Sequence, residues 1–217
     1  MMDRPRILLT GFGPFPGVLV NQTASLIEAV AQDPRAKTLN AEIITAVLPT
    51  EWHRGLAAAR TLIANVKPHA ALHFGVSPLA RGFVIEQQAC NVCTRSADAN
   101  GGLPEAPQIA ADGPAFLTAT VPITAIEAAL RASRVPVTLS RDAGRYLCNA
   151  VFYQSLSDHM APTMTGFVHV PKVFGWRGRI KEEQAVRGGI VIVETCLQYL
   201  PVPPAKTYLK VQEVLKG

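Results

Sequence analysis

Short runs of apolar residues alternate along the chain with longer segments in which apolar residues recur at helical spacing. The runs have the length of buried β-strands, and the longer segments have the period of helices that bury one face. The predicted strands cover residues 6–9, 42–48, 69–76, 83–92, 135–139 and 166–170, and the predicted helices cover residues 21–30, 51–66, 122–132, 144–159 and 181–199. This alternation predicts an α/β fold, in which helices cover a central sheet.

The chain has the length of one α/β domain. Its 217 residues show no internal repeat and no linker, so we expect a single domain over residues 1–217. Apolar periodicity is lost between residues 95 and 114, where Gly, Pro, Asn and Ala are frequent. We expect a long surface loop there, and such loops often shape functional sites. Thr50 stands where its side chain could cap the helix over residues 51–66.

Composition excludes several classes of protein. With 48% hydrophobic and 17% charged residues, the chain can bury a large core, which excludes a disordered tail or a charged coiled coil. No apolar run reaches the ~18 residues of a membrane helix, and the N-terminus lacks a signal-peptide pattern. We therefore expect a cytoplasmic protein without a membrane partner and with its four cysteines reduced. The net charge of +5 comes from scattered Lys and Arg residues, so no nucleic-acid partner is expected.

The segment around Cys148 runs from a strand through a polar turn into a helix. This order places Cys148 in about the second helical turn or earlier. A thiolate there is stabilised by the peptide dipoles of the helix, and the free backbone N–H groups can also hold an oxyanion. Taken alone, however, a cysteine in this place is more often a small core residue.

Two further polar residues interrupt apolar strands. His169 lies near the carboxyl end of its strand, where open α/β sheets bind ligands, and it could accept the proton of Cys148. Glu86 could orient the imidazole of His169 in a nucleophile–base–acid triad. The alternatives are a core histidine bonded to a backbone carbonyl, and a solvent-facing glutamate paired with Arg81 or Arg95. Spacing alone does not decide between them.

The glycine- and proline-rich loop after the first strand is a second candidate for a binding site. Its glycine spacing does not fit the dinucleotide fingerprint G-x-G-x-x-G. Phe12 and Phe15 could instead sandwich a small flat group, although each alone would more often belong to the core. Ser77 sits in a partial nucleophile elbow, but Leu79 replaces the closing glycine, so Ser77 is a poor nucleophile.

Paired cysteines and histidines suggest metal or redox chemistry only weakly. Cys90 and Cys93 form a C-x-x-C, and His69 and His73 form an H-x-x-x-H. A structural zinc site needs a second paired set, and a redox pair normally opens a helix. We therefore expect no metal.

Together these motifs resemble the pyroglutamyl peptidase I (pyrrolidone-carboxylate peptidase) family of cytosolic cysteine peptidases. The similar segments are Leu-Leu-Thr-Gly-Phe-Gly-Pro-Phe near the N-terminus, Glu86 with Asn91, Ala-Gly-x-x-Leu-Cys-Asn-x-x-Phe-Tyr around Cys148, and Gly-Phe-Val-His-Val-Pro around His169. In order and spacing they run from Ile7 to about Leu200.

The resemblance implies a fold, an activity and a set of site residues. The fold would be a single three-layer α/β/α domain with a twisted, mostly parallel central sheet, often assembled as a homotetramer. Cys148, His169 and Glu86 would form a triad that removes an N-terminal pyroglutamyl residue from peptides, without metal or organic cofactor. The substrate would be a peptide or small amide with a blocked N-terminus.

The resemblance also assigns residues to the substrate pocket and shows one departure. Phe12 and Phe15 would pack on the pyrrolidone ring, Asn21 follows their loop, and Arg95 looks like the arginine downstream of the triad acid. Val76 stands where the family usually has a glutamine that bonds the lactam, and Pro-Leu-Ala-Arg follows where Gly-Gly-Arg is usual. A valine cannot pair with a buried lactam group, and an unpaired group costs about 1–3 kcal/mol.

Three functions therefore remain open. The first is removal of N-terminal pyroglutamate. The second is the same triad acting on a different small N-acyl or cyclic-amide group, because of Val76. The third, from another class, is a non-catalytic redox or binding protein that uses Cys90 and Cys93.

Overall fold

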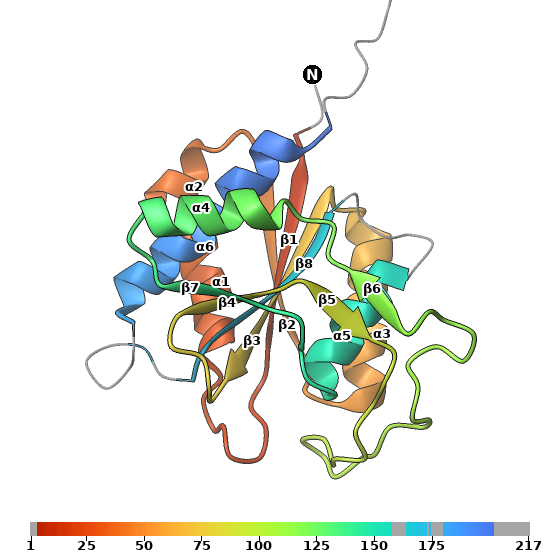
Figure 1. The fold of residues 1–217 in the computed structure, drawn as a ribbon. Helices are drawn as coiled ribbons and strands as arrows, with labels where there is room; N and C mark the ends of the chain where they lie inside the picture. The colour runs from red at the N-terminus through yellow and green to blue at the C-terminus, as the bar shows by residue number, and fades with distance from the viewer. Residues whose placement is uncertain (1–3, 158–163, 173, 175–179, 202–217) are drawn as a thin grey trace, which may run out of the picture.

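A six-stranded sheet forms the centre of the molecule (Figure 1). The structure is a computed structural model that describes residues 4–157, 164–172, 174 and 180–201. The strands of the central sheet are β1 (Arg6–Phe12), β2 (Glu42–Leu48), β3 (Ala70–Ser77), β4 (Phe83–Glu86), β7 (Val137–Ser140) and β8 (Met164–Pro171). Their order is β2-β1-β3-β8-β4-β7. Only β4 and β8 pair antiparallel, so the expected mostly parallel sheet is confirmed.

Helices cover both faces of this sheet, which makes three layers. They are α1 (Gln22–Gln32), α2 (Pro34–Thr38), α3 (Trp52–Val66), α4 (Ile123–Ala132), α5 (Leu147–Ser157) and α6 (Glu182–Tyr199). α3 and α5 pack together on one face, and α1, α4 and α6 pack on the other (Figure 1). The predicted single α/β/α domain is therefore confirmed.

A second, smaller sheet was not expected from the sequence. β5 (Gln88–Cys90) pairs antiparallel with β6 (Phe116–Thr118). The predicted strand over residues 83–92 is thus two strands in two sheets. The break is at Gln87, whose N–H donates to Ser140 O of the large sheet while its carbonyl accepts from Ala119 N. No helix or strand is described between residues 91 and 115, where a long loop was predicted.

Two helix starts differ from the prediction. α3 begins at Trp52, and Thr50 does not cap it, because the Thr50 hydroxyl donates to Gly13 O at 2.9 Å. Asp98, on the long loop, accepts from Trp52 N at 2.9 Å instead. α5 begins at Leu147 rather than at residue 144, which places Cys148 in the first turn. The predicted end of that helix, at residue 159, lies outside the described residues.

The central strands are buried on both sides. β8 is buried along its whole length and β3 along all but its last residue, because helices lie on either face. The carboxyl ends of β1, β3 and β8 meet at one edge of the sheet, the lower edge in Figure 1. In α/β sheets this edge is where ligands bind.

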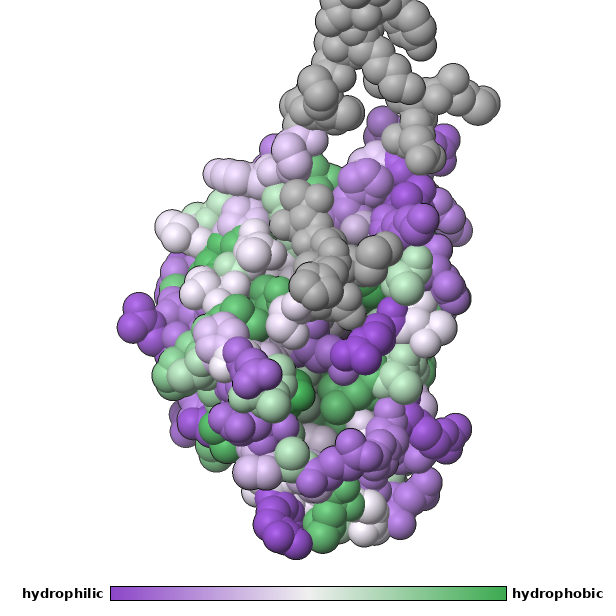
Figure 2. All heavy atoms as spheres, turned by 90° about the vertical axis from the view of Figure 1, so that its right-hand side faces the viewer, coloured by the Kyte–Doolittle hydropathy of each residue, from purple (hydrophilic) through white to green (hydrophobic). Residues whose placement is uncertain are grey.

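Among the helices that the structure describes, none is both long and apolar enough to cross a bilayer. On the side that faces right in Figure 1, hydrophilic and hydrophobic residues are interspersed over the part that the described residues cover (Figure 2).

Candidate active site

Cys148 lies where the first turn of α5 meets the end of β3. The thiol is partly buried, and it stands at the helix end where peptide dipoles and free N–H groups favour negative charge. Gly75 of β3 faces the sulfur so closely that a Cβ on Gly75 would be 2.9 Å from Sγ and 2.8 Å from the ring of Phe167. The space for the thiol therefore depends on a glycine at position 75.

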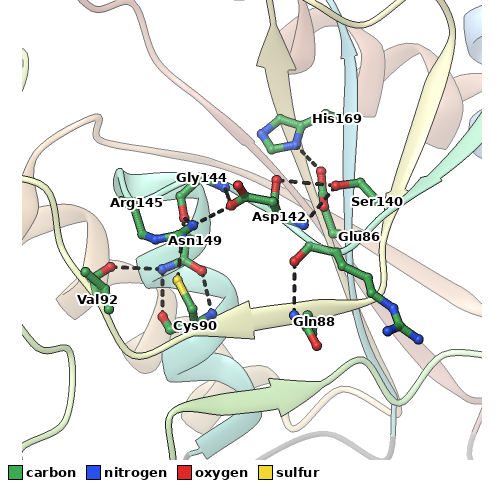
Figure 3. Close-up of polar contacts among 11 residues, drawn as sticks. Glu86, Gln88, Cys90, Val92, Ser140, Asp142, Gly144, Arg145, Asn149 and His169 are labelled. Carbon is green, nitrogen blue, oxygen red and sulfur yellow. Dashed lines mark hydrogen bonds and ion pairs between the residues drawn. The ribbon is translucent and has the colours of Figure 1, made fainter.

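His169 of β8 connects Cys148 with Glu86 of β4. His169 Nδ1 lies 2.8 Å from Glu86 Oε1 (Figure 3), which leaves Nε2 as the ring nitrogen available to Cys148, whose side chain helps to raise the pKa of His169. Both side chains are buried, His169 with 8% and Glu86 with 2% of its surface exposed. The alternative pairing of Glu86 with Arg81 or Arg95 is thus wrong, since its partner is His169.

The surroundings of His169 favour its charged form. Burial by itself would lower the pKa of His169, but the hydrogen bonds with Cys148 and Glu86 outweigh burial and raise this pKa to about 9. An imidazolium beside a sulfur stabilises a thiolate, so the pair is suited to nucleophilic attack on a carbonyl.

Asn149 anchors the start of α5, a role that the sequence analysis did not assign to it. Its buried amide accepts from Cys90 N at 2.8 Å and donates to Cys90 O at 2.8 Å and Val92 O at 3.2 Å (Figure 3). These bonds tie the residue next to Cys148 to β5 and the chain just beyond it. The sequence did offer a signal for this role, because Asn149 is a polar residue next to the candidate nucleophile in the otherwise apolar first turn of the helix.

A cavity of about 680 Å³ opens beside the thiol at the carboxyl edge of the sheet. Three aromatic residues line its β1 side: Phe12, Phe15 and Tyr146. The ring centroids of Phe15 and Tyr146 lie 6.4 Å apart, and Trp52 and Tyr146 pack in a T-shaped pair with centroids 5.2 Å apart. Tyr146 was not predicted, because an aromatic residue just before a helix is equally typical of the core.

Asn21 and Val76 also line the cavity, as expected. Asn21 is the N-cap of α1 and donates to Gly13 O at 3.1 Å, while its Oδ1 accepts from Thr23 N and Thr23 Oγ1. Its polar atoms therefore hold the loop that carries Phe15. Val76 presents an apolar wall and is almost fully buried.

The structure does not place Arg95 in the cavity. Arg95 is exposed on the long loop and is not among the lining residues, and the residue before it is held to the turn before α5 by a hydrogen bond from Thr94 N to Arg145 O. Within the described ranges, the arginine that lines the cavity is Arg81, from the β3–β4 loop.

Asp142 is the second charged residue at the cavity that sequence analysis missed. Its carboxylate accepts from Arg145 Nη1 and from Gly144 N, and the hydrogen bond with Arg145 is the main cause that lowers the pKa of Asp142. Gly144 has φ +82°, a conformation that glycine adopts without strain. This turn leads the chain into α5.

The paired cysteines and histidines make other contacts. Cys90 Sγ donates to Gly144 O at 3.6 Å, and burial raises the pKa of Cys93. His73 Nδ1 lies 2.7 Å from Thr10 Oγ1, and His69 Nδ1 accepts from the backbone of the first strand. Among the described residues, no three His, Cys, Asp or Glu side chains gather as a metal site would require.

Comparison with known proteins identifies the family of the chain. The family model described as pyroglutamyl peptidase matches residues 5–184. The chain belongs to the pyroglutamyl peptidase family. It is therefore a hydrolase of the cysteine peptidase class.

Individual relatives agree with this assignment. The chain is 32% identical over 172 residues to the pyrrolidone-carboxylate peptidase of Thermococcus litoralis, covering 76% of each protein. It is 32% identical over 204 residues to pyrrolidone-carboxylate peptidase 1 of Ralstonia nicotianae, covering 89% of this chain and 94% of the relative. The solved structure of a mutant pyrrolidone carboxyl peptidase from Pyrococcus furiosus superposes with a TM-score of 0.82 at 27% identity, covering 90% of this chain and 99% of that one.

Proposed function

We propose that this pyroglutamyl peptidase removes an N-terminal pyroglutamyl residue from peptides, with Cys148 as nucleophile, His169 as base and Glu86 as the orienting acid. The observation that supports the proposal is the continuous contact from Cys148 through His169 to Glu86 beside an aromatic cavity. Glu86 holds Nδ1 and so fixes the tautomer that exposes Nε2 to the thiol.

In the acylation step, His169 takes the proton of the Cys148 thiol. The sulfur forms a bond to the pyroglutamyl carbonyl carbon, and the N–H groups at the start of α5 stabilise the oxyanion. Protonated His169 then gives its proton to the nitrogen of the next residue, and the carbon–nitrogen bond breaks. The amine leaves, and a thioester between Cys148 and the pyroglutamyl group remains.

Water completes the cycle. His169 takes a proton from the water as the oxygen attacks the thioester carbonyl, and the carbon–sulfur bond breaks. The sulfur leaves as a thiolate beside the imidazolium of His169. Pyroglutamic acid is released, and the free thiol–imidazole pair is restored.

The cavity next to Cys148 suits an uncharged ring. A lactam has no ammonium group to desolvate, so the rings of Phe12, Phe15 and Tyr146 can pack on it at little cost. An N-terminal proline has the same ring size but carries a positive charge. We expect the cavity to discriminate against proline for this reason.

The test is amine release from a fluorogenic pyroglutamyl amide, with the matching prolyl amide as substrate control. We expect cleavage of the pyroglutamyl amide alone, loss of that activity in Cys148→Ala and Cys148→Ser, and retained activity in Cys93→Ala. Retained activity in either Cys148 variant overturns the triad. Dependence on Cys93 instead would support redox or binding chemistry at Cys90 and Cys93.

Val76 favours a second candidate, the same triad acting on another small N-acyl or cyclic amide. Its side chain lines the cavity and offers no hydrogen bond to a lactam. A panel of N-acetyl, pyroglutamyl and six-membered lactam amides separates the two candidates. If the pyroglutamyl group is the natural substrate, the pyroglutamyl amide is cleaved fastest of the panel. Val76→Gln then increases its turnover, because the glutamine offers the lactam a hydrogen-bond partner. A different leading substrate supports the second candidate.

A cytoplasmic location and assembly as a homo-oligomer are further parts of the proposal. Four free cysteines are consistent with a reducing compartment. The family resemblance supports a homotetramer, which sedimentation velocity at several protein concentrations would detect. A monomer at all concentrations would contradict the assembly.

A further inference from the structure

The cavity crosses several strands of the sheet, and its two ends differ in chemistry. At the β1 end lie the aromatic residues, and next come Cys148 beside β3 and His169 on β8. Beyond His169 the lining passes to Val84 of β4 and Thr138 of β7, under the β3–β4 loop. The thiol and the imidazole therefore divide an aromatic end from a β4–β7 end.

The β4–β7 end is on the side of the leaving group, if the proposed function holds. His169 protonates the departing nitrogen, so that nitrogen must lie next to the imidazole. With the lactam ring on Phe12 and Phe15, the chain that follows continues past His169 toward Val84. The first released residue therefore lies between β4, β7 and the β3–β4 loop.

Arg81 gives this end an unbalanced positive charge. Among the residues that the structure describes, three charged side chains besides His169 line the cavity: Arg81, Glu86 and Asp142. Glu86 is paired with His169, and Asp142 is paired with Arg145. Within the described part of the chain, Arg81 makes no hydrogen bond or ion pair. Lys172, which follows β8, donates to Gly17 O at 3.2 Å and does not line the cavity.

We propose that Arg81 binds a carboxylate on the first residue of the leaving group, so that the enzyme favours substrates that are anionic at this position. This inference rests on the proposed function. A guanidinium matches a carboxylate with two parallel hydrogen bonds. In a pyroglutamyl dipeptide the α-carboxylate follows the scissile nitrogen within about one residue length, roughly 3.5 Å, which keeps it inside this cavity.

The test compares three substrates by kcat/KM for amine release. Pyroglutamyl-alanine carries the α-carboxylate, pyroglutamyl-alaninamide carries none, and the α-amide of pyroglutamyl-aspartate carries a carboxylate on the side chain only. We expect the dipeptide to exceed the amide by about two- to fivefold, the range an exposed ion pair supports. The substrate with the side-chain carboxylate shows whether a side-chain carboxylate increases kcat/KM as the α-carboxylate does. Added salt should reduce the preference, because it screens an exposed pair.

Variants assign the preference to Arg81. Arg81→Gln should bring the dipeptide-to-amide ratio close to unity, and Arg81→Lys should keep part of it. Arg4→Gln, at the opposite end of β1, removes the same charge elsewhere and should keep the wild-type ratio. A wild-type ratio of one, or a preference unchanged in Arg81→Gln, overturns the inference while leaving the proposed function intact. No cleavage of either alanine substrate overturns both.

Discussion

Gly75 controls how closely the nucleophile approaches the sheet. A Cβ at this position would be 2.9 Å from Cys148 Sγ, closer than side-chain atoms pack, so the sulfur or the ring of Phe167 must move. Small displacements of reacting groups can cost about 10²-fold in rate. Gly75→Ala should therefore lower kcat by roughly that factor while the chain still folds.

Activity and circular dichroism together check the effect of Gly75→Ala. A folded variant with slow iodoacetamide labelling at Cys148 agrees with a displaced sulfur. Wild-type kcat in a folded variant would show that the thiol does not depend on this space.

Glu86 is expected to control the alkaline limit of activity. Its hydrogen bond contributes to raising the pKa of His169 to about 9. Glu86→Gln removes the negative charge, so the pKa of His169 falls and the imidazolium is lost at lower pH. The alkaline limb of the kcat/KM profile should move to lower pH, and kcat should fall by roughly tenfold or more.

Asp142→Asn is the matched control for Glu86→Gln. It removes a carboxylate from the same cavity, but that carboxylate is paired with Arg145 rather than His169. The alkaline limb should stay in place in this variant. If the alkaline limb of the kcat/KM profile stays in place in Glu86→Gln, Glu86 does not influence the pKa of His169.

For single residues, part of the candidate site could be predicted from the sequence. Cys148 and His169 were recognisable because one begins a helix and the other ends an apolar strand. Their contact could not be predicted, because it depends on the order of the strands in the sheet, which decides whether the two side chains lie at neighbouring strand ends. Arg81 and Tyr146 were missed, since a loop arginine and a core-like aromatic carry no local pattern. Arg95 was assigned to the substrate pocket by resemblance to the family, but the sequence does not determine whether a loop side chain faces the pocket or the solvent.

Among the elements, α5 depends on one side chain for its position against β5. Asn149→Ala would leave Cys90 N and Cys90 O buried without their partner, which costs about 1–3 kcal/mol of unfolding free energy. Ser157→Ala, an exposed hydroxyl at the other end of α5, serves as control. Urea unfolding should show a lower midpoint for the first variant only. Equal midpoints for the two variants would contradict the role of Asn149.

The elements that the sequence predicted best are those buried on both faces. β3 and β8 appear as apolar runs because helices cover both sides. β6 was missed because three residues with exposed ends show no alternation. The run over 83–92 was taken as one strand because hydrophobicity continues through Gln87, although the hydrogen-bonding partner changes there.

For the whole molecule, His73 predicts a loss of stability in weak acid. Burial lowers the pKa of His73 to about 4, whereas an unfolded histidine titrates near 6.5. Between these values the unfolded chain binds a proton that the native chain does not, so stability falls as pH falls. The full effect is about 3 kcal/mol. His169 has the opposite pH dependence. Because its pKa is raised to about 9 in the native chain, its contribution to stability is present below pH 6.5 and is lost as pH rises from 6.5 through about 9.

Urea unfolding between pH 4 and 7 measures the contribution of His73. His73→Leu should flatten the pH dependence in this range, and the exposed His53→Leu should not. An equal slope in all three proteins would contradict the assignment to His73.

The central claim is that turnover depends on the sulfur of Cys148 next to the aromatic cavity. It is tested most directly by iodoacetamide labelling at mildly acidic pH, with peptide mapping and residual activity followed together. We predict that activity is lost in step with modification of Cys148, and that 2-pyrrolidone, a free lactam ring, slows both. Full modification of Cys148 with activity retained, or loss of activity that follows Cys90 or Cys93 instead, would contradict the account.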